Sequence, residues 1–332
     1  MLTEDYITEV YCFIDDMMKE CWKNIRKRGP GPKLSDAEVI TMEIAGESLG
    51  MDCDKTIHRY FRDHWRHLFP NLGTRTTFLR QAANLWRVKQ EIRRILLTRL
   101  LPNGSRISIV DGFPMPVCGF RRAHFSKLFK GEATYGYCAA KAMTYYGLKG
   151  HLLIDLSGII VDCTVASANI DEREMLLEMH SEPGSIVLGD KGYICNKTMK
   201  AEFGALGILL HTPLRSNMKD DRSPEEVKAL NNQRRLIETV IAQLTERFNA
   251  EKIRARDLWH LTVRISRKLL AHSINCCINQ KYGNSLLQFE RIFVKKLAHG
   301  VIHGKYKEMP DENLRYDETT RQTARCAGTY PV

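Results

Sequence analysis

No stretch of the 332-residue sequence approaches the roughly 20 consecutive apolar residues that a membrane-spanning helix needs, and the first residues show no signal-peptide pattern. The ten cysteines form no Cys-x-x-Cys pair, and His124, His151 and His211 lack the paired spacing of a transition-metal site. These absences argue against a membrane protein, a zinc protein and a disulfide-stapled secreted domain. We expect a cytoplasmic protein whose reduced cysteines pack as small hydrophobic side chains.

Positive charge is abundant and unevenly placed. The chain carries 50 Lys and Arg against 39 Asp and Glu, a formal charge of +11. Residues 55–99 hold 11 basic and 2 acidic side chains, a balance of 11 − 2 = +9, whereas residues 1–54 hold 6 basic and 12 acidic ones, a balance of 6 − 12 = −6. Segregated charge of this kind is typical of a surface that binds a polyanion such as DNA. Taken alone, residues 55–99 could equally be solvated basic helix faces.

The first hundred residues show helical patterns. Ser35 and Glu38 form a capping box before an amphipathic run that ends at Gly50. A second helix is expected from about Asp54, with Arg59 and Arg62 on its polar side. Two short helices joined by a tight turn suggest a helix-turn-helix-like DNA-binding domain over residues 1–104, although many helical bundles share this pattern.

From residue 105 the pattern changes to short strands interrupted by helices. The expected order is strand, hairpin, helix, strand, helix, strand, long helix, which is the order of a ribonuclease-H-like fold with a mixed five-stranded sheet. We place this α/β catalytic core at residues 105–282 and a partly disordered tail at 283–332. The expected elements after a single helix over 77–100 are strands 107–111, 149–155 and 159–165, helix 169–179, strand 185–190, helix 196–203, strand 208–211 and a helix that starts after Ser223.

Three acids stand at informative places in this pattern. Asp111 and Asp190 each end a short apolar run, and Glu238 lies on the last long helix, at the edge of its apolar stripe and one turn after Arg234. Three carboxylates brought together repel one another unless a cation lies between them, and Mg²⁺ or Mn²⁺ prefers such oxygen ligands. Two such ions roughly 4 Å apart activate the attacking oxygen and stabilise the leaving one in phosphodiester chemistry. The alternative for any single acid is a surface turn or an i,i+4 ion pair.

The segments around these acids resemble the three acidic signatures of bacterial insertion-sequence transposases with a DDE site. The resemblance is strongest to the group numbered nine-eighty-two, related to the insertion-sequence-four-like transposases, and runs over about residues 1–298. The segments that carry it are 111–117, 189–193 and 234–240, with 31–38 and 255–260 in addition.

This resemblance implies a ribonuclease-H-like core that cuts and joins DNA at the ends of a mobile element. Asp111, Asp190 and Glu238 would be the catalytic and metal-binding residues, holding two Mg²⁺ ions, with Mn²⁺ possible. The implied partners are transposon-end DNA and target DNA, bound by a homodimer or higher oligomer in a synaptic complex near the nucleoid. The candidate DNA-binding residues are Lys191, Arg234, Arg235, Arg121, Arg122, Arg59, Arg62, Arg254 and Arg256.

The sequence departs from the related transposases around the glutamate. Many of them carry a tyrosine seven residues before it and a lysine seven residues after it, where this chain has Asn231 and Thr245. Arg235, Arg247 or Lys252 could replace the missing lysine. A further basic cluster on a terminal helix could bind DNA or face solvent, and comprises Arg254, Arg256, Arg264, Arg267 and Lys268.

Two other functions use part of the same pattern. A ribonuclease-H-like nuclease would share the three acids and hydrolyse DNA without joining it. A non-catalytic DNA-binding repressor would need only residues 1–104 and would leave the acids unexplained. Other acids compete for the catalytic roles, but Asp155 and Asp162 flank the hairpin turn and are expected to face solvent. The first turn of a helix accounts for the remaining three, Asp171, Glu172 and Glu174.

Overall fold

A six-stranded mixed sheet and two groups of helices make up the part of the chain that carries the acids. The structure is a computed structural model, and it describes residues 1–21, 31–139, 141–179, 184–218, 220, 222–252 and 254–293. The strands are β1 (Ile107–Gly119), β2 (Thr134–Cys138), β3 (Met143–Asp155), β4 (Ile160–Ser167), β5 (Ile186–Leu188) and β6 (Leu209–His211). This mixed α/β architecture with a curled sheet is consistent with a ribonuclease-H-like core.

The strand order is β2-β3-β1-β5-β6, and β4 also pairs with β3. The pairs among β1 to β4 are antiparallel, whereas β5 runs parallel to both β1 and β6. The predicted hairpin is confirmed as β3 and β4, and the predicted strands near 185 and 208 are confirmed as β5 and β6. The strand β2 was not predicted.

The first strand is longer than expected. It does not end at Asp111 but continues to Gly119, paired throughout with β3. Its parallel pairing with β5 covers only residues 107–109, so everything beyond Ile109 is an edge on that side. Because an edge strand tolerates proline, Pro114 and Pro116 do not stop the strand as they would in the middle of a sheet.

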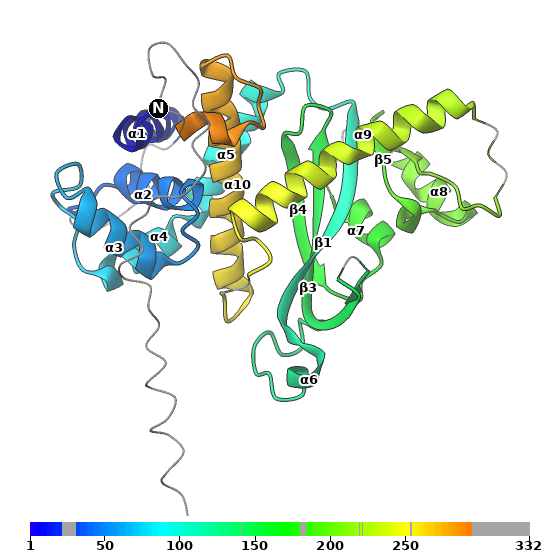
Figure 1. Ribbon diagram of the computed structural model, residues 1–332, viewed down its shortest axis with the longest axis horizontal. Helices are drawn as coiled ribbons and strands as arrows, with labels where there is room; N and C mark the ends of the chain where they lie inside the picture. Colours follow the sequence, from blue (N-terminus) through cyan, green and yellow to red (C-terminus); the bar gives the residue numbers. More distant parts are fainter. Residues whose placement is uncertain are drawn as a thin grey trace, which may run out of the picture. The chain divides into compact units, whose positions relative to one another are not determined.

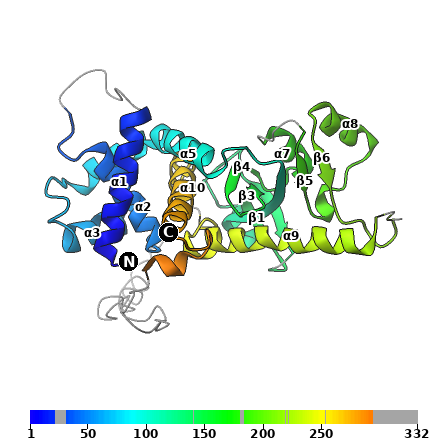
Figure 2. The ribbon, with the colours of Figure 1, turned by 90° about the horizontal axis from the view of Figure 1, so that it is seen from above.

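Helices cover both faces of the sheet (Figures 1 and 2). The long helix α9 (Pro224–Ala242) lies on one face, and α7 (Glu172–Glu178) and α8 (Lys197–Ala205) lie on the other. The apolar core divides in the same way: Ile109 and Phe113 of β1 pack in the cluster that contains Ile237 of α9, whereas Val110 packs in the cluster that contains Leu176 of α7. Alternate residues of β1 therefore face opposite helices.

Local hydrogen bonding explains where several helices begin. Ser35 and Ser223 each form the predicted capping box, in which the serine side chain accepts a hydrogen bond from the backbone of the glutamate three residues later. A proline in the first turn of α9 reinforces its start, because its fixed φ suits that position.

The first hundred residues are helical, as predicted. Their helices are α1 (Thr3–Cys21), α2 (Asp36–Ser48), α3 (Asp54–His64), α4 (Arg75–Asn84) and α5 (Trp86–Leu100). The expectation of one helix over 77–100 is wrong, because the chain breaks at Leu85, whose N–H turns back to the carbonyl of Ala82. The Lys89 ammonium donates to that same carbonyl at 3.1 Å and so stabilises the end of α4.

The helical part also includes a helix from the other end of the chain. Helix α10 (Leu258–Lys281) packs against α2 and α5, and residues Met1–Phe293 form one compact unit without a division at residue 104. The boundary at 104 stays a prediction. The short 3-10 helix η3 (Phe289–Phe293) packs Phe289 and Ile292 into the core, whereas the rest of the predicted tail, 294–332, lies outside the described residues. Among the described helices, none is long and apolar enough to cross a bilayer.

Candidate active site

Two of the three predicted acids lie at the same end of the β1–β5 strand pair, beyond the carboxyl end of β5. Asp111 lies two residues past the last pairing of β1 with β5, and Asp190 lies two residues past the end of β5 itself. Since β1 and β5 are parallel neighbours, both aspartates are placed at the same end of this strand pair. Each carboxylate accepts a backbone hydrogen bond of 2.7 Å, Asp111 from the N–H of Gly112 and Asp190 from the N–H of Gly192.

The electrostatics of Asp111 report its surroundings. Burial raises the pKa of its carboxyl to about 6, and the negative charges of Asp190 and Glu172 add to this rise. The hydrogen bond from Gly112 and the positive charge of Arg234 act in the opposite direction but do not cancel it. A buried carboxylate beside other acids, whose charge is not fully compensated, is the environment in which a bound cation is most strongly favoured.

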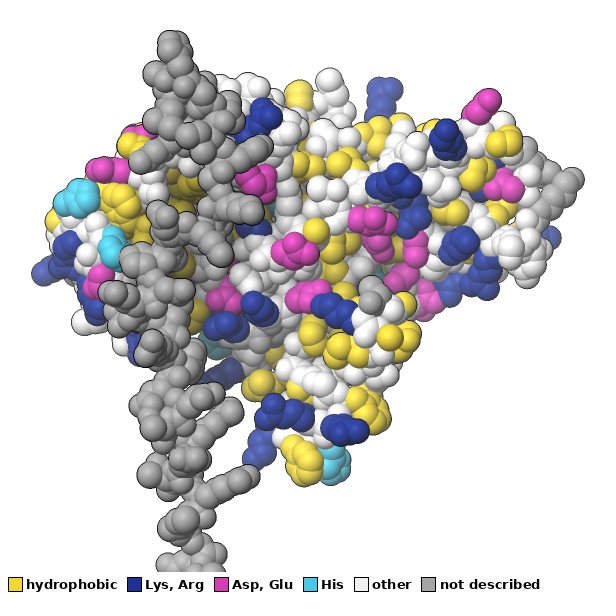
Figure 3. All heavy atoms as spheres, viewed as in Figure 1, with side chains coloured by type: hydrophobic (Ala, Val, Ile, Leu, Met, Phe, Trp, Pro, Cys, Tyr) yellow, Lys and Arg dark blue, Asp and Glu magenta, His cyan; other side chains and the backbone are white. Residues whose placement is uncertain are grey.

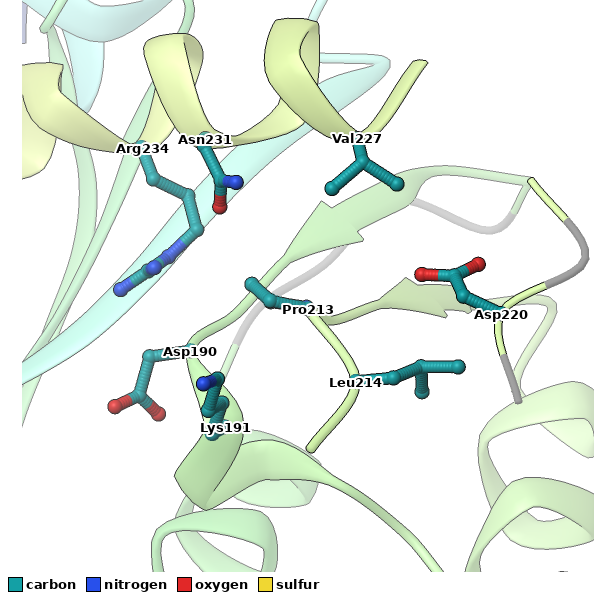
Figure 4. Close-up of a pocket in the computed structure, with 8 residues that line it drawn as sticks. All are labelled: Asp190, Lys191, Pro213, Leu214, Asp220, Val227, Asn231 and Arg234. Carbon is teal, nitrogen blue, oxygen red and sulfur yellow. The ribbon is translucent and has the colours of Figure 1, made fainter. Parts of the chain in front are cut away.

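The helix α9 supplies a basic and polar lining over Asp190. Arg234 and Asn231 share a pocket of about 370 Å³ with Asp190 and Lys191. Figure 4 shows Arg234 and Asn231 pointing from α9 toward the turn that carries Asp190 and Lys191. The Nε of Arg234 is buried and has no hydrogen-bond partner among the described residues.

Glu238, the third predicted acid, lies on α9. It is exposed, and it lies four residues after Arg234, so the two side chains share one face of α9. Within the described ranges, no group of three or more His, Cys, Asp or Glu side chains is assembled at metal-ligand spacing. The pair Asp111 and Asp190 nevertheless fits a hard divalent cation, because both are oxygen donors and the charge repulsion at Asp111 would be relieved by one.

An acid that we assigned to a helix start is there as expected and also lies near Asp111. Glu172 begins α7, and its charge reaches both Asp111 and the buried Tyr193, whose hydroxyl has no hydrogen-bond partner among the described residues. Burial and these acids raise the pKa of Tyr193 far above its ordinary value, so the hydroxyl keeps its proton. Nothing in the local sequence distinguishes Glu172 from an acid that favours the positive end of a helix dipole. The only available signal is that its helix precedes β5.

The predicted DNA-binding residues occupy several surfaces. Arg121 and Arg122 are exposed on the short helix α6 (Phe120–Ala123), and Arg235 is exposed on α9. Figure 3 shows acidic side chains gathered over the sheet, with groups of Lys and Arg side chains on both sides of them. Arg59, Arg62, Lys191 and Arg256 are also exposed, and Arg62 is paired with Asp63 at 2.7 Å. Arg254 is half-exposed and paired with Asp52 at 3.0 Å.

The basic cluster that comprises Arg254, Arg256, Arg264, Arg267 and Lys268 is partly internal. This corrects the expectation that the cluster could bind DNA or face solvent. Arg267 and Lys268 are buried in α10 and paired with acids of α2, so they are unavailable to DNA. Asp155 is also buried, where its carboxylate accepts hydrogen bonds from the Ile159 N–H and the Ser157 hydroxyl within the hairpin turn. These residues stabilise the fold.

The raised pKa of Asp111 predicts an unusual pH dependence. Between about pH 4 and pH 6 the folded protein binds this proton more tightly than the unfolded chain, so stability falls as pH rises through that window. Asp111→Asn removes this loss. In EDTA at pH 7.5 the variant should be more stable than the wild type by on the order of 1–3 kcal/mol, and the difference should vanish below pH 4. Urea unfolding at both pH values measures this, and equal stability at pH 7.5 would contradict a buried, repelled carboxylate.

A comparison with protein-family models gives a match in this part of the chain. No curated protein and no solved structure shows significant similarity to the chain. Residues 102–258 match the family model described as a transposase DDE domain, and this span contains Asp111, Asp190 and Glu238. The match and the pairing of the two aspartates together support a DDE transposase.

Proposed function

We propose that the protein is the transposase of a bacterial insertion sequence, which cleaves DNA at the ends of its element and joins the freed ends to target DNA. The observation that carries this proposal is the pairing of Asp111 and Asp190 beyond the end of β5, under the Arg234 of α9, inside the span that matches a transposase DDE domain. Two neighbouring acids, Asp111 largely buried and Asp190 partly exposed, beneath a basic lining suit the transfer of a phosphodiester, because the reacting group is an anion that needs both a cation and neutralising side chains.

The residues divide into two roles in this proposal. Asp111, Asp190 and Glu238 would hold two Mg²⁺ ions, or Mn²⁺ in their place. When bound, such ions lower the pKa of the attacking water or hydroxyl and stabilise the leaving oxygen. Arg234 and Lys191 would bind the phosphate that enters the pocket, and the rigid backbone hydrogen bonds to Asp111 and Asp190 would keep the carboxylates oriented.

DNA contacts outside the pocket would come from basic side chains on separate elements. We assign the transposon end and the target to surfaces that include α3, α6 and α9, with two or more copies of the chain pairing the two ends. The charge of +11 and the exposed arginines support this assignment. The residues are Arg59, Arg62, Arg121, Arg122, Arg235, Arg254 and Arg256.

An assay with labelled end DNA and a supercoiled target tests the function. A transposase gives joined products in Mg²⁺, a ribonuclease-H-like nuclease gives cleaved products only, and a repressor shifts the DNA in a gel without cutting it. Cleavage without joining, under conditions in which a preprocessed end with a free 3′ hydroxyl is supplied, would overturn the transposase and favour the nuclease. A shifted band alone would remove the catalytic role of the acids.

The arginines of α6 give a separate prediction about DNA affinity. Arg121→Gln combined with Arg122→Gln should weaken binding to any DNA sequence and should reduce the slope of log affinity against log salt concentration by about 2, because each lost phosphate contact releases about one counterion fewer. Fluorescence anisotropy between 50 and 300 mM salt would measure the slope. Arg99→Gln is the matched control, since Arg99 is exposed but already paired with Glu20 at 2.6 Å. An unchanged slope would exclude α6 from the interface.

A further inference from the structure

An ion pair joins the central strand β3 to the start of α7 beside the two aspartates. The ammonium of Lys149 and the carboxylate of Glu172 are in direct contact, and each side chain is only 23 % exposed. Glu172 is not needed to cap its helix, because the Asp171 side chain already accepts a hydrogen bond from the Arg173 N–H at 2.9 Å. The pair therefore does something other than begin α7.

Two glycines of the acidic motifs leave the space that this pair occupies. A Cβ atom added at Gly112 would lie 2.7 Å from Cε of Lys149 and 3.6 Å from Oε1 of Glu172. One added at Gly192 would lie 2.3 Å from Oε2 of Glu172 and 2.9 Å from Oδ1 of Asp190. Neither glycine has a positive φ, so the lack of a side chain, and not an unusual backbone conformation, is what leaves this space for the ion pair.

Through these contacts, the Lys149–Glu172 ion pair lies close to the backbone of both the Asp111 segment and the Asp190 segment. Gly112 directly follows Asp111, and the N–H of Gly192 holds the Asp190 carboxylate. Asp111 faces α9, while Gly112 opens the opposite face of β1 toward α7. The Lys149–Glu172 ion pair therefore packs against one glycine of each segment.

We propose that the Lys149–Glu172 ion pair is a positioning element that holds the Asp111 and Asp190 segments at the spacing at which the two carboxylates share a divalent cation. This inference rests on the proposed metal-dependent function. Lys149 and Glu172 are positioning residues and touch neither the DNA nor the reacting atoms. Loss of either side chain frees the two segments and weakens binding of the cation, although the aspartates themselves remain.

The variant Lys149→Met distinguishes a positioning role of Lys149 from the effect of its positive charge on cation binding. Removing a positive charge near an acid pair should by itself strengthen cation binding, because less repulsion opposes the incoming ion. Loss of a positioning pair should instead weaken it. We expect the Mn²⁺ concentration at half-saturation, measured by isothermal titration calorimetry on the full-length protein, to rise about tenfold, with a parallel rise in the Mn²⁺ needed for end cleavage. Lys200→Met, an exposed lysine of α8, is the matched control and should leave both unchanged.

Gly112→Ala is a second variant that alters no charge. The new methyl group should displace the Lys149 side chain and raise the half-saturating Mn²⁺ concentration in the same direction. Equal or tighter Mn²⁺ binding by Lys149→Met overturns the inference. If Lys149→Met does not fold, as judged by circular dichroism, Gly112→Ala decides, and an unchanged half-saturation overturns the inference. Asp111→Asn distinguishes failure of the positioning role from failure of the proposed metal centre. Undiminished Mn²⁺ binding by that variant would refute the metal centre itself.

Discussion

Asp190→Asn is expected to reduce cleavage of transposon-end DNA by about 10³-fold or more while leaving DNA binding intact, because an amide is a much poorer ligand for a divalent cation than a carboxylate. The substitution preserves the shape of the side chain, and its oxygen still accepts the hydrogen bond from Gly192, so the turn after β5 should keep its structure. A single-turnover cleavage assay in Mg²⁺, with binding measured in Ca²⁺ by anisotropy, separates the two effects.

Asp162→Asn is the matched control for that experiment. Asp162 lies on β4 and its carboxylate accepts a hydrogen bond from the Cys163 N–H, so the same change of side chain occurs on the same sheet without touching the pair of aspartates. Its cleavage rate should remain within about twofold of the wild type. Wild-type cleavage by Asp190→Asn would refute the assignment of the active site, whatever the outcome for the DNA-binding surfaces.

Local patterns predicted the order of elements in the core because each element carries its own signal. The capping boxes at Ser35 and Ser223 depend on side chains three residues apart, and the hairpin of β3 and β4 depends on alternation around a tight turn. The continuation of β1 past Asp111 could not be predicted in this way. Its Pro114 and Pro116 suggest the end of a strand unless it is known that β5 stops at Leu188 and leaves an edge.

The same limit applies to the candidate site. Asp111 and Asp190 were identifiable because strands that run parallel bring their ends together, and each aspartate lies two residues past the last paired residues of β1 and β5, Ile109 and Leu188. The position of Glu238 relative to them depends on how α9 crosses the sheet, which the sequence does not specify, and its metal-binding role stays a prediction. The Lys149–Glu172 pair joins residues 23 positions apart on different elements, so no helical or strand period reveals it.

The sequence did not predict the charged side chains that are buried between helices distant in the chain. Arg267 of α10 donates to Glu47 at 2.6 Å and to Glu43 at 3.4 Å, both on α2, and it also contacts Asp54 of α3. Lys268 donates to the other oxygen of Glu47 at 2.9 Å. The partners lie more than 200 residues apart, which is why a basic run on a terminal helix resembled a DNA-binding surface. Lys89 extends this network by donating to Glu43 at 2.7 Å, and Arg264 pairs with Asp54 at 3.2 Å.

Because these charges are buried, the stability of the protein depends on each member of the network. Arg267→Met should destabilise the protein by about 3–5 kcal/mol, because it leaves buried carboxylates without their main counter-charge. Urea unfolding followed by circular dichroism measures the loss, and Lys19→Met provides the control, since Lys19 is 69 % exposed and its pairing with Asp15 should contribute nothing measurable. An Arg267→Met midpoint equal to that of the wild type would show that α10 and α2 are held together by their apolar contacts alone. A loss of the expected size, with wild-type end cleavage at low temperature, would confirm that these basic residues act in folding and not in DNA binding.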